Sequence, residues 1–258
     1  MGKTALITGA SAGIGGRFAH LLAKEGYDLV LVARDGVRLA ETANALKAEF
    51  GTKCEVLVAD LSTENGVRSV EQRVADSDHP VGVLINNAGF GIGVSFLKSQ
   101  VDVEQQMLDV LVKAPMRLMH SVLPGMKERD LGIIINVSSV AGWITGGTYS
   151  AAKSYLTVLS ESLHTELRGT KVKVLALCPG FTHTEFHQRG KMRMDALPKF
   201  MWLEADHVVA KAWSDAVAGK AISVPGWQYR FLSRLARFAP RPMVRKIGMN
   251  VRVKQRQK

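Results

Sequence analysis

The chain has 258 residues, of which 47% are hydrophobic and 22% are charged, an ordinary balance for one large globular domain. It has two cysteines, Cys54 and Cys178, which excludes a disulfide framework or a cysteine-based metal site and fits a reducing, cytoplasmic setting. The formal net charge of +11 is uneven: residues 216–258 hold eleven Lys and Arg and no Asp or Glu, so the whole excess lies in this C-terminal segment.

Seven apolar, β-branched runs alternate with helical stretches along the chain. The runs cover residues 4–8, 28–34, 54–60, 81–89, 132–139, 171–180 and 221–226. Because they show little polar alternation, they indicate strands buried on both faces. We therefore predict an α/β fold: a doubly wound, Rossmann-type parallel sheet of about seven strands with helices on both faces. The first run begins at once, so we expect no signal peptide, and no apolar run reaches the ~20 residues of a membrane-spanning helix.

The first run leads into a glycine-rich turn, TGASAGIG at residues 8–15, and then into a helix. Glycines let the chain turn tightly and let a diphosphate approach main-chain N–H groups, while the helix N-terminus contributes a partial positive charge. The spacing is not G-x-G-x-x-G, and a simple βα turn is the alternative interpretation. The position after the first strand favours a dinucleotide site, whose turn residues would be Gly9, Ser11, Gly13, Ile14 and Gly15.

The second run ends in Ala33-Arg34, where a site for NAD would carry an acidic residue. A guanidinium at this place can pair with the 2′-phosphate of NADP, which a carboxylate would repel. We therefore predict that the site binds NADP(H) rather than NAD(H), through Arg34. Asp35 is expected to cap the next helix. Arg38, one turn into that helix, could assist Arg34 or be solvated, and the solvated interpretation is preferred.

Tyr149 and Lys153 are four residues apart in YSAAK, which places both side chains on one face of a helix. A nearby ammonium favours the phenolate, so the pair can exchange a proton nearer neutral pH. Ser138 and Ser139 end a strand-like run ten residues earlier, and a hydroxyl there can donate to a carbonyl oxygen. Alone, the Tyr–Lys spacing is a weak motif, with a packed tyrosine and a surface lysine as the alternative.

Together and in this order, the motifs make the chain resemble the short-chain dehydrogenase/reductase family over about residues 3–226. The segments that carry the resemblance are TGASAGIG, Asp60-Leu61, NNAG (86–89), VSSVAG (137–142), YSAAK (149–153) and PGFTHT (179–184). The resemblance implies an NADP(H)-dependent oxidoreductase that transfers a hydride between nicotinamide and a carbonyl or alcohol substrate, assembled as a homodimer or homotetramer.

The resemblance also implies a role for each matching residue. Tyr149 would be the general acid/base, Lys153 would lower the tyrosine pKa and hold the nicotinamide ribose, and Ser139, with Ser138 as second choice, would orient the carbonyl. The implied cofactor contacts are Gly9, Ser11, Gly13, Ile14, Gly15, Arg34, Asp60, Leu61, Asn87, Ala88, Gly89, Tyr149, Lys153, Pro179, Gly180, Thr182 and Thr184.

The chain departs from the family pattern at two places. Leu111 stands where family members commonly carry an asparagine that relays protons through water to the lysine. An apolar side chain cannot hold that water, so a non-catalytic NADP(H)-binding protein is the alternative function. The loop between Ser139 and Tyr149 is shorter than is usual in the family, which would open one wall of the substrate pocket.

We divide the chain into a Rossmann-type cofactor-binding and catalytic domain over residues 1–226 and a basic amphipathic segment over residues 227–258. The resemblance implies a substrate lid at about residues 183–203. Its apolar side chains favour a small apolar carbonyl or alcohol substrate, although packing of the lid itself is an alternative role for some of them; they are Phe186, Met192, Met194, Phe200, Met201 and Trp202. No metal site is expected, and His183 and His187 are interpreted as lid or surface residues.

The segment 227–258 begins as a basic amphipathic helix, which ends before Pro240 and Pro242. Residues 228–258 would either make a peripheral contact with an anionic membrane or dock on the body and close the pocket or a dimer contact. Nucleic-acid binding is not expected, since no recognition motif accompanies the charge. The residues at helical spacing are Phe231, Leu235 and Phe238, flanked by Arg230, Arg234 and Arg237.

Overall fold

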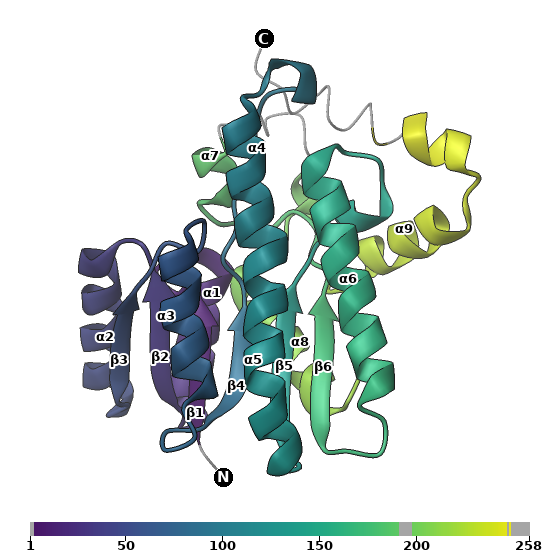
Figure 1. Cartoon of the computed structure of the whole chain (residues 1–258). Coiled ribbons are helices and arrows are strands. Elements are labelled where there is room, and N and C mark those ends of the chain that lie inside the picture. Colours follow the sequence, from purple (N-terminus) through teal and green to yellow (C-terminus); the bar gives the residue numbers. More distant parts are fainter. Residues whose placement is uncertain (1–2, 191–197, 247, 249–258) are drawn as a thin grey trace.

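A seven-stranded parallel sheet forms the centre of the computed structural model, which describes residues 3–190, 198–246 and 248 (Figure 1). The strand order is β3-β2-β1-β4-β5-β6-β7. The predicted doubly wound α/β fold is confirmed, with all paired strands parallel. The strands are β1 (Thr4–Thr8), β2 (Asp28–Ala33), β3 (Cys54–Val58), β4 (Val81–Asn86), β5 (Gly132–Val137), β6 (Val172–Leu177) and β7 (Ile222–Ser223).

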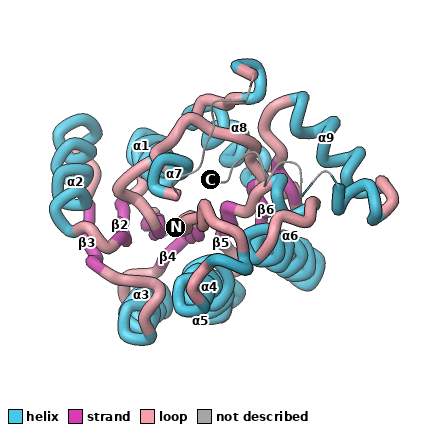
Figure 2. The backbone as a smooth tube through the Cα atoms, turned by 90° about the horizontal axis from the view of Figure 1, so that it is seen from above, coloured by secondary structure: helices cyan, strands magenta, loops and turns pink. Residues whose placement is uncertain are grey.

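Helices cover both faces of this sheet (Figure 2). One face packs against α1 (Gly13–Lys24), α2 (Gly36–Phe50) and α8 (Ala205–Val217). The other face packs against α3 (Glu64–Ala75), α5 (Ala114–Glu128) and α6 (Thr148–Glu166), with α4 (Val101–Leu108) leading into α5. Two further helices, α7 (Phe186–Arg189) and α9 (Trp227–Phe238), follow β6 and β7. Within the described residues, no helix has both the length and the apolar character needed to cross a membrane.

The central strands are apolar throughout because each contributes to two cores. In β1, Ala5 and Ile7 pack on the side of α1 and α8, while Leu6 packs on the side of α3 and α5. The edge strand β3 differs from the prediction of burial on both faces, since Val56 and Val58 are exposed. An edge strand with no neighbour beyond it has a less complete cover of helices, and the sequence pattern alone does not identify the edge.

The long helical stretch that precedes β5 is interrupted. A π-helical turn, residues Asp109–Lys113, lies between α4 and α5, and the Ala114 N–H donates to the Asp109 carbonyl across five residues. Pro115 explains the interruption, because it lacks the N–H that would bond to the Leu111 carbonyl in a regular α-helix. The turn fixes the place of Leu111 beside the segment that follows β4.

Candidate active site

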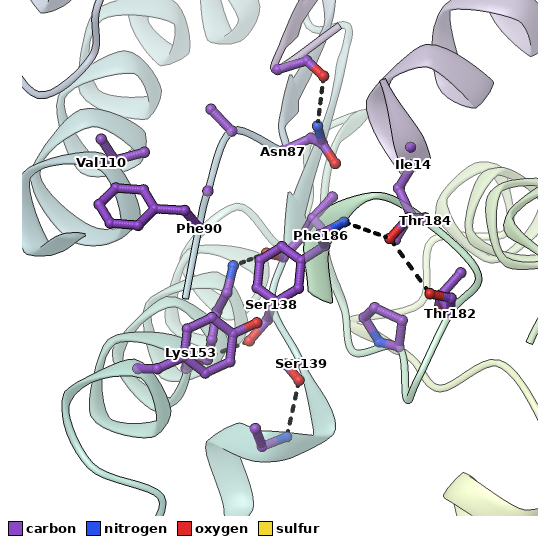
Figure 3. A pocket seen from close by; sticks show the side chains of 18 of the residues that line it. Ile14, Asn87, Phe90, Val110, Ser138, Ser139, Lys153, Thr182, Thr184 and Phe186 are labelled. Atoms are coloured by element: carbon purple, nitrogen blue, oxygen red, sulfur yellow. Dashed lines mark hydrogen bonds between the residues drawn. The ribbon is translucent and has the colours of Figure 1, made fainter. Parts of the chain in front are cut away.

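A pocket of about 1050 Å³ opens at the carboxyl ends of the strands (Figure 3). The strand order reverses between β1 and β4, and crevices of parallel sheets form at such a point. Nearly all of the site residues predicted from the sequence line it: Gly9, Ser11, Gly13, Ile14, Arg34, Asp60, Leu61, Asn87, Ala88, Gly89, Ser138, Ser139, Tyr149, Lys153, Pro179, Gly180, Thr182 and Thr184. The segments after six different strands, β1 to β6, thus converge on one space.

Gly15 is the predicted site residue that does not line the pocket, and its role is packing. A Cβ on Gly15 would lie 2.2 Å from the Gly9 carbonyl oxygen and 2.4 Å from Nδ2 of Asn87. The same Asn87 amide donates to the carbonyl oxygens of Thr8 at 2.9 Å and of Gly9 at 3.2 Å. The NNAG segment therefore braces the glycine turn, and only glycine fits between them.

The N-terminus of α1 faces the pocket with its N–H groups available. Ala12 is the N-cap residue and provides no side-chain cap, and the first turn holds no acidic residue. Ala12, Gly13 and Ile14 all line the pocket. Uncapped N–H groups and the positive end of the helix form a suitable place for a phosphate or diphosphate.

Two arginines follow β2 at the edge of the pocket. Arg34 is exposed and lines the pocket, and Asp35 caps α2 by accepting from the Arg38 N–H at 3.1 Å, as predicted. The interpretation of Arg38 as solvated is wrong: its guanidinium makes two hydrogen bonds to Glu185, at 2.8 and 3.1 Å. Glu185 also pairs with Arg189, and the two arginines lower the pKa of its carboxyl to about 2.

Tyr149 stands at the start of α6 with its side chain enclosed. Burial raises the pKa of its hydroxyl to about 12, and a hydrogen bond with Ser139 offsets only part of this effect. The ring of Phe186 packs against the tyrosine ring, with 5.9 Å between the ring centroids. Burial thus favours the neutral phenol, whose oxygen meets the hydroxyl of Ser139.

Lys153 lies one turn further along α6 and is also buried. Its Nζ donates to the Val137 carbonyl at 2.6 Å and lies 5.7 Å from the centroid of the Tyr149 ring. Burial lowers the pKa of this amine to about 8. A lowering of the Tyr149 pKa by Lys153 is not found in this structure: burial of the phenol and its hydrogen bond with Ser139 shift that pKa, and the Lys153 Nζ is bonded to the Val137 carbonyl.

The two serines after β5 have separate roles. The Ser138 hydroxyl is buried and bonded to the Lys153 carbonyl and to Thr157 Oγ1, both at 2.7 Å, so it fixes α6 on the sheet. Ser139 faces the pocket, where its Oγ accepts from the Ala141 N–H at 3.1 Å (Figure 3). The geometry favours Ser139 as the hydroxyl that meets a substrate, in line with the first choice from the sequence.

Leu111 is buried in an apolar cluster with Met107 and with Ala152 of α6. It is 1% exposed, and a Cβ on Gly89 would lie 2.7 Å from its Cδ2. A cavity of about 10 Å³ lies beside it, lined also by Asn86 and Lys153, and Oδ1 of Asn86 has no hydrogen-bond partner among the described residues. The side chain at position 111 brings no polar atom to this cavity, which is at the lower limit for a single water molecule.

The sequence did not identify most of the apolar wall of the pocket. Phe186 was expected there, but the segment after NNAG and the C-terminal segment also contribute. The wall residues in loops have no periodicity that marks them, and those in helices stand at positions that local periodicity does not connect with a pocket. Only Leu235 belonged to a predicted amphipathic pattern. The missed wall residues are Phe90, Ile92, Val94, Val110, Ile144, Leu232, Ala236, Ala239 and Val244.

The C-terminal segment covers the wall that the short loop after Ser139 leaves open. The hydroxyl of Tyr229 accepts from the Phe181 N–H at 3.0 Å and donates to the Met201 carbonyl at 2.5 Å. Its ring excludes any side chain at position 180, because a Cβ on Gly180 would lie 2.0 Å from the ring. The Arg237 guanidinium stacks on Trp143, 4.6 Å from the ring centroid, in the short turn 140–143. Docking on the body, one of the two expected roles of this segment, is thus what α9 does.

The predicted lid is described only in part. Met201 lines the pocket, but Phe200 is exposed, and Trp202 stacks on His183 with 4.5 Å between ring centroids. His183 is exposed, as interpreted from the sequence. Met192, Met194 and the side chain of His187 lie outside the described residues.

Comparisons with known proteins agree with this geometry. The family model for short chain dehydrogenases matches residues 3–194. A ketoacyl reductase, HetN, from Nostoc sp. is 34% identical over 86% of this chain and 78% of its own length. A short-chain dehydrogenase from Sphingobium yanoikuyae, solved in complex with NADPH, has a TM-score of 0.83 at 32% identity and covers 91% of this chain and 93% of its own.

A third protein bears on the cofactor. A short-chain dehydrogenase/reductase from Burkholderia phymatum, solved in complex with NAD, has a TM-score of 0.79 at 26% identity over 90% of this chain and 92% of its own. Similar structures thus hold either of the two nicotinamide cofactors. The extent of the family match and the identity to HetN lead to one conclusion: the chain belongs to the short-chain dehydrogenase/reductase family of oxidoreductases.

Proposed function

We propose that the protein is an NADP(H)-dependent reductase of bulky, apolar carbonyl compounds. The same site would catalyse the reverse reaction, the oxidation of the alcohol. One observation carries the proposal: a single pocket joins the uncapped N-terminus of α1 and Arg34 to the Tyr149–Ser139 pair and then to an apolar wall. Each part of a hydride transfer to a carbonyl thus has a place in one cavity.

The cofactor preference rests on the end of β2. Ala33 stands where a carboxylate would hold a ribose 2′-hydroxyl, and the Asp35 carboxylate, at the edge of the pocket, is engaged in capping α2. Arg34 is exposed at the pocket and forms no ion pair with another described residue, so its guanidinium can meet a 2′-phosphate. These features favour NADP(H) over NAD(H).

The proposed chemistry uses three side chains of the pocket. When bound, the reduced nicotinamide supplies a hydride to the carbonyl carbon. Ser139 and Tyr149 donate hydrogen bonds to the carbonyl oxygen, and the Tyr149 hydroxyl gives its proton to that oxygen as negative charge develops there. The Lys153 ammonium stabilises the phenolate that remains and holds the nicotinamide ribose. The products are the alcohol and the oxidised cofactor.

The substrate class follows from the wall opposite the proton donor. Ile92, Val94, Ile144, Leu232 and Leu235 line the pocket beyond the catalytic side chains. They offer an apolar surface to the part of the substrate that does not react, which favours a large hydrophobic ketone over a charged sugar. The ketoacyl reductase activity in the name of HetN is consistent with a ketone attached to an apolar chain.

The test is NADPH oxidation against a panel of apolar ketones, aldehydes and diketones. We expect turnover with the natural sequence and a loss of at least about 100-fold in Tyr149→Phe, since the variant keeps the ring but lacks the proton. Tyr155→Phe, a half-exposed tyrosine on the same helix, is the matched control and should retain activity. Equal activity in Tyr149→Phe would remove the tyrosine from the mechanism.

Leu111 supports a second candidate function, a protein that binds NADP(H) without efficient turnover. Its side chain places no polar atom beside the Asn86–Lys153 cavity, so proton supply to the lysine lacks the usual carrier. If the natural sequence is silent and Leu111→Asn is active, the second candidate is favoured. If both turn over at similar rates, position 111 does not limit the chemistry.

The assembly is proposed to be a homodimer or homotetramer formed through α5 and α6. These neighbouring helices expose apolar side chains, Met116 on α5 and Tyr155 and Val158 on α6. A self-complementary pairing would cover them. Sedimentation of the natural sequence and of Val158→Glu tests this, and a change of mass in the variant is expected.

A further inference from the structure

One face of α9 is fixed against the body, which determines what its other face presents. Gln228 Nε2 donates to the Phe200 carbonyl at 3.0 Å, and the buried Tyr229 bonds to two main-chain groups. Ser233, one turn further, is also buried. Figures 1 and 2 show α9 at the margin of the molecule, beyond the helices that cover the sheet.

The opposite face of α9 carries large aromatic side chains in solvent. Trp227 is 71% exposed, Phe231 66% and Phe238 88%. Separations of four and seven residues place the three on one line along the helix. Such a stripe is costly in water, and clustered exposed aromatic side chains mark an interaction surface.

A row of arginines runs beside this aromatic stripe. Arg230, Arg234 and Arg237 are exposed at spacings of four and three residues, and Arg241 and Arg245 continue beyond the helix. In the part of the chain that the structure describes, none of the five forms an ion pair, and the guanidinium of Arg237 lies over the ring of Trp143. Because no Asp or Glu follows Asp215, this charge is uncompensated within the segment.

These observations distinguish between two occupants of the surface. Pairing of α9 with α9 of a second copy would bring the two arginine rows together, which is unfavourable without acidic partners. A bilayer with anionic headgroups accommodates the aromatic stripe and the arginine row together. Its interface takes up Trp and Phe side chains, and its acidic lipids neutralise the charge of the arginines. We propose that α9 docks the protein on an anionic lipid bilayer, with Trp227, Phe231 and Phe238 in the headgroup region and the arginine row on the acidic lipids.

Docking would bring the pocket to the membrane surface. Leu232 and Leu235 belong to the same helix and line the pocket while remaining partly exposed. The apolar wall therefore reaches the surface beside the aromatic stripe, so a ketone dissolved in the bilayer would enter without crossing water. This consequence rests on the proposed reductase function, whereas the docking itself does not.

The test is co-sedimentation of the full chain with vesicles of phosphatidylcholine alone or mixed with phosphatidylserine. We expect binding to the mixed vesicles and little to phosphatidylcholine, with weaker binding at high salt. The charge variant Arg230→Glu/Arg234→Glu should lose at least about fivefold in affinity for each reversed arginine. The aromatic variant Trp227→Ser/Phe231→Ser/Phe238→Ser should lose binding even at low salt.

Matched controls lie on exposed positions elsewhere. Phe96→Ser/Leu97→Ser removes apolar side chains of comparable exposure, and Lys24→Glu/Lys47→Glu reverses two charges at the ends of α1 and α2. Both controls should bind like the natural sequence. A blue shift of tryptophan emission on vesicle addition that is absent in Trp227→Phe would place that residue in the interface.

Three results would overturn the proposal. The first is no binding of the natural sequence to the mixed vesicles, and the second is equal binding by the charge variant and the natural sequence. The third is a natural protein that does not bind vesicles but forms a dimer, which the aromatic variant abolishes. Vesicle binding needs no turnover, so a failure of the reductase function leaves this test intact. A water-soluble ketone should be reduced equally by the natural sequence and both α9 variants, and a ketone dissolved in the vesicles more slowly by the variants.

Discussion

Two arginines, four residues apart after β2, differ in what they contact. Arg38 is bound to Glu185, whereas Arg34 is exposed at the pocket. The ion pair of Arg38 could not be predicted from the sequence, because Glu185 is 147 positions away along the chain and no local pattern indicates that the two residues meet. The acidic partner explains why only one of the two is expected to meet the cofactor phosphate.

Replacement of Arg34 tests the cofactor preference. Loss of a charge-assisted bond costs ~1.5–3 kcal/mol, so Arg34→Ala should weaken NADPH binding by about 10- to 100-fold and leave NADH within about twofold. Arg17→Ala, an exposed arginine on α1 outside the pocket, is the control. The measurement is fluorescence titration with both cofactors. An unchanged ratio of the two dissociation constants in Arg34→Ala would contradict the assignment.

The pKa of Lys153 sets the expected pH dependence. Burial lowers this pKa to about 8, whereas that of Tyr149 is about 12, so the lysine loses its charge first as the pH rises. We expect kcat/KM for ketone reduction to fall above about pH 8 with the slope of one proton, because the neutral amine no longer stabilises the phenolate. The measurement is the pH profile from neutral to alkaline.

A conservative variant identifies the group that titrates. In Lys153→Arg the guanidinium stays charged, so the alkaline limb should move to higher pH even if the rate is lower. Lys171→Arg, an exposed lysine next to Asp130, should keep the natural profile. A limb that stays near the same pH in Lys153→Arg would assign it to another group.

At the scale of elements, the attachment of α9 depends on a few contacts that are remote in sequence. Tyr229 links the loop after β6 to the turn near Met201, and both partners lie 28 or more positions away. The sequence predicted a helix in this segment from its periodicity and left open whether it docks or meets a membrane. The periodicity could not decide, since the buried face carries Gln228, Tyr229 and Ser233 rather than an apolar stripe, and polar groups of Gln228 and Tyr229 hold it on the body.

Tyr229→Phe tests this attachment. The variant keeps the ring over Gly180 but loses the acceptor for the Phe181 N–H and the donor to the Met201 carbonyl, so the free energy of unfolding should fall by about 1–3 kcal/mol. Urea unfolding measures this change. Tyr155→Phe on the half-exposed face of α6 is the control and should change stability by less than about 0.5 kcal/mol. Equal effects in the two variants would show that the hydroxyl of Tyr229 contributes nothing to docking.

Some of the helices and strands were predictable from the sequence, and others were not. The strands and the motifs at their carboxyl ends were predictable because apolar runs and glycine or polar signatures are local. The π-helical turn at Asp109–Lys113 was not predicted, although Pro115 is its local cause, because a proline inside a helical stretch can also be accommodated by a kink or by the start of a new helix. The exposure of β3 was missed because an edge position depends on strand order.

For the whole molecule, the fold predicted from strand–helix alternation matches the seven-stranded sheet, and the convergence of the motifs follows from it. What the sequence could not provide is the closure of the pocket. That closure joins Phe90 and Val94 after β4, Ile144 before α6, and Leu232 with Leu235 on α9, and no two of these segments share a local pattern. This extended apolar wall is the reason for proposing a bulky substrate.

Transfer of deuterium from NADPH that carries deuterium at both hydrogen positions of the nicotinamide C4 tests the reductase function most directly. The protein is incubated with the labelled cofactor and a bulky apolar ketone that the panel selects, and the product is analysed by mass spectrometry. The account predicts an alcohol with deuterium on its carbinol carbon, formed by the natural sequence and by Tyr155→Phe and almost absent with Tyr149→Phe. An alcohol without deuterium, or equal labelling with Tyr149→Phe, would contradict it.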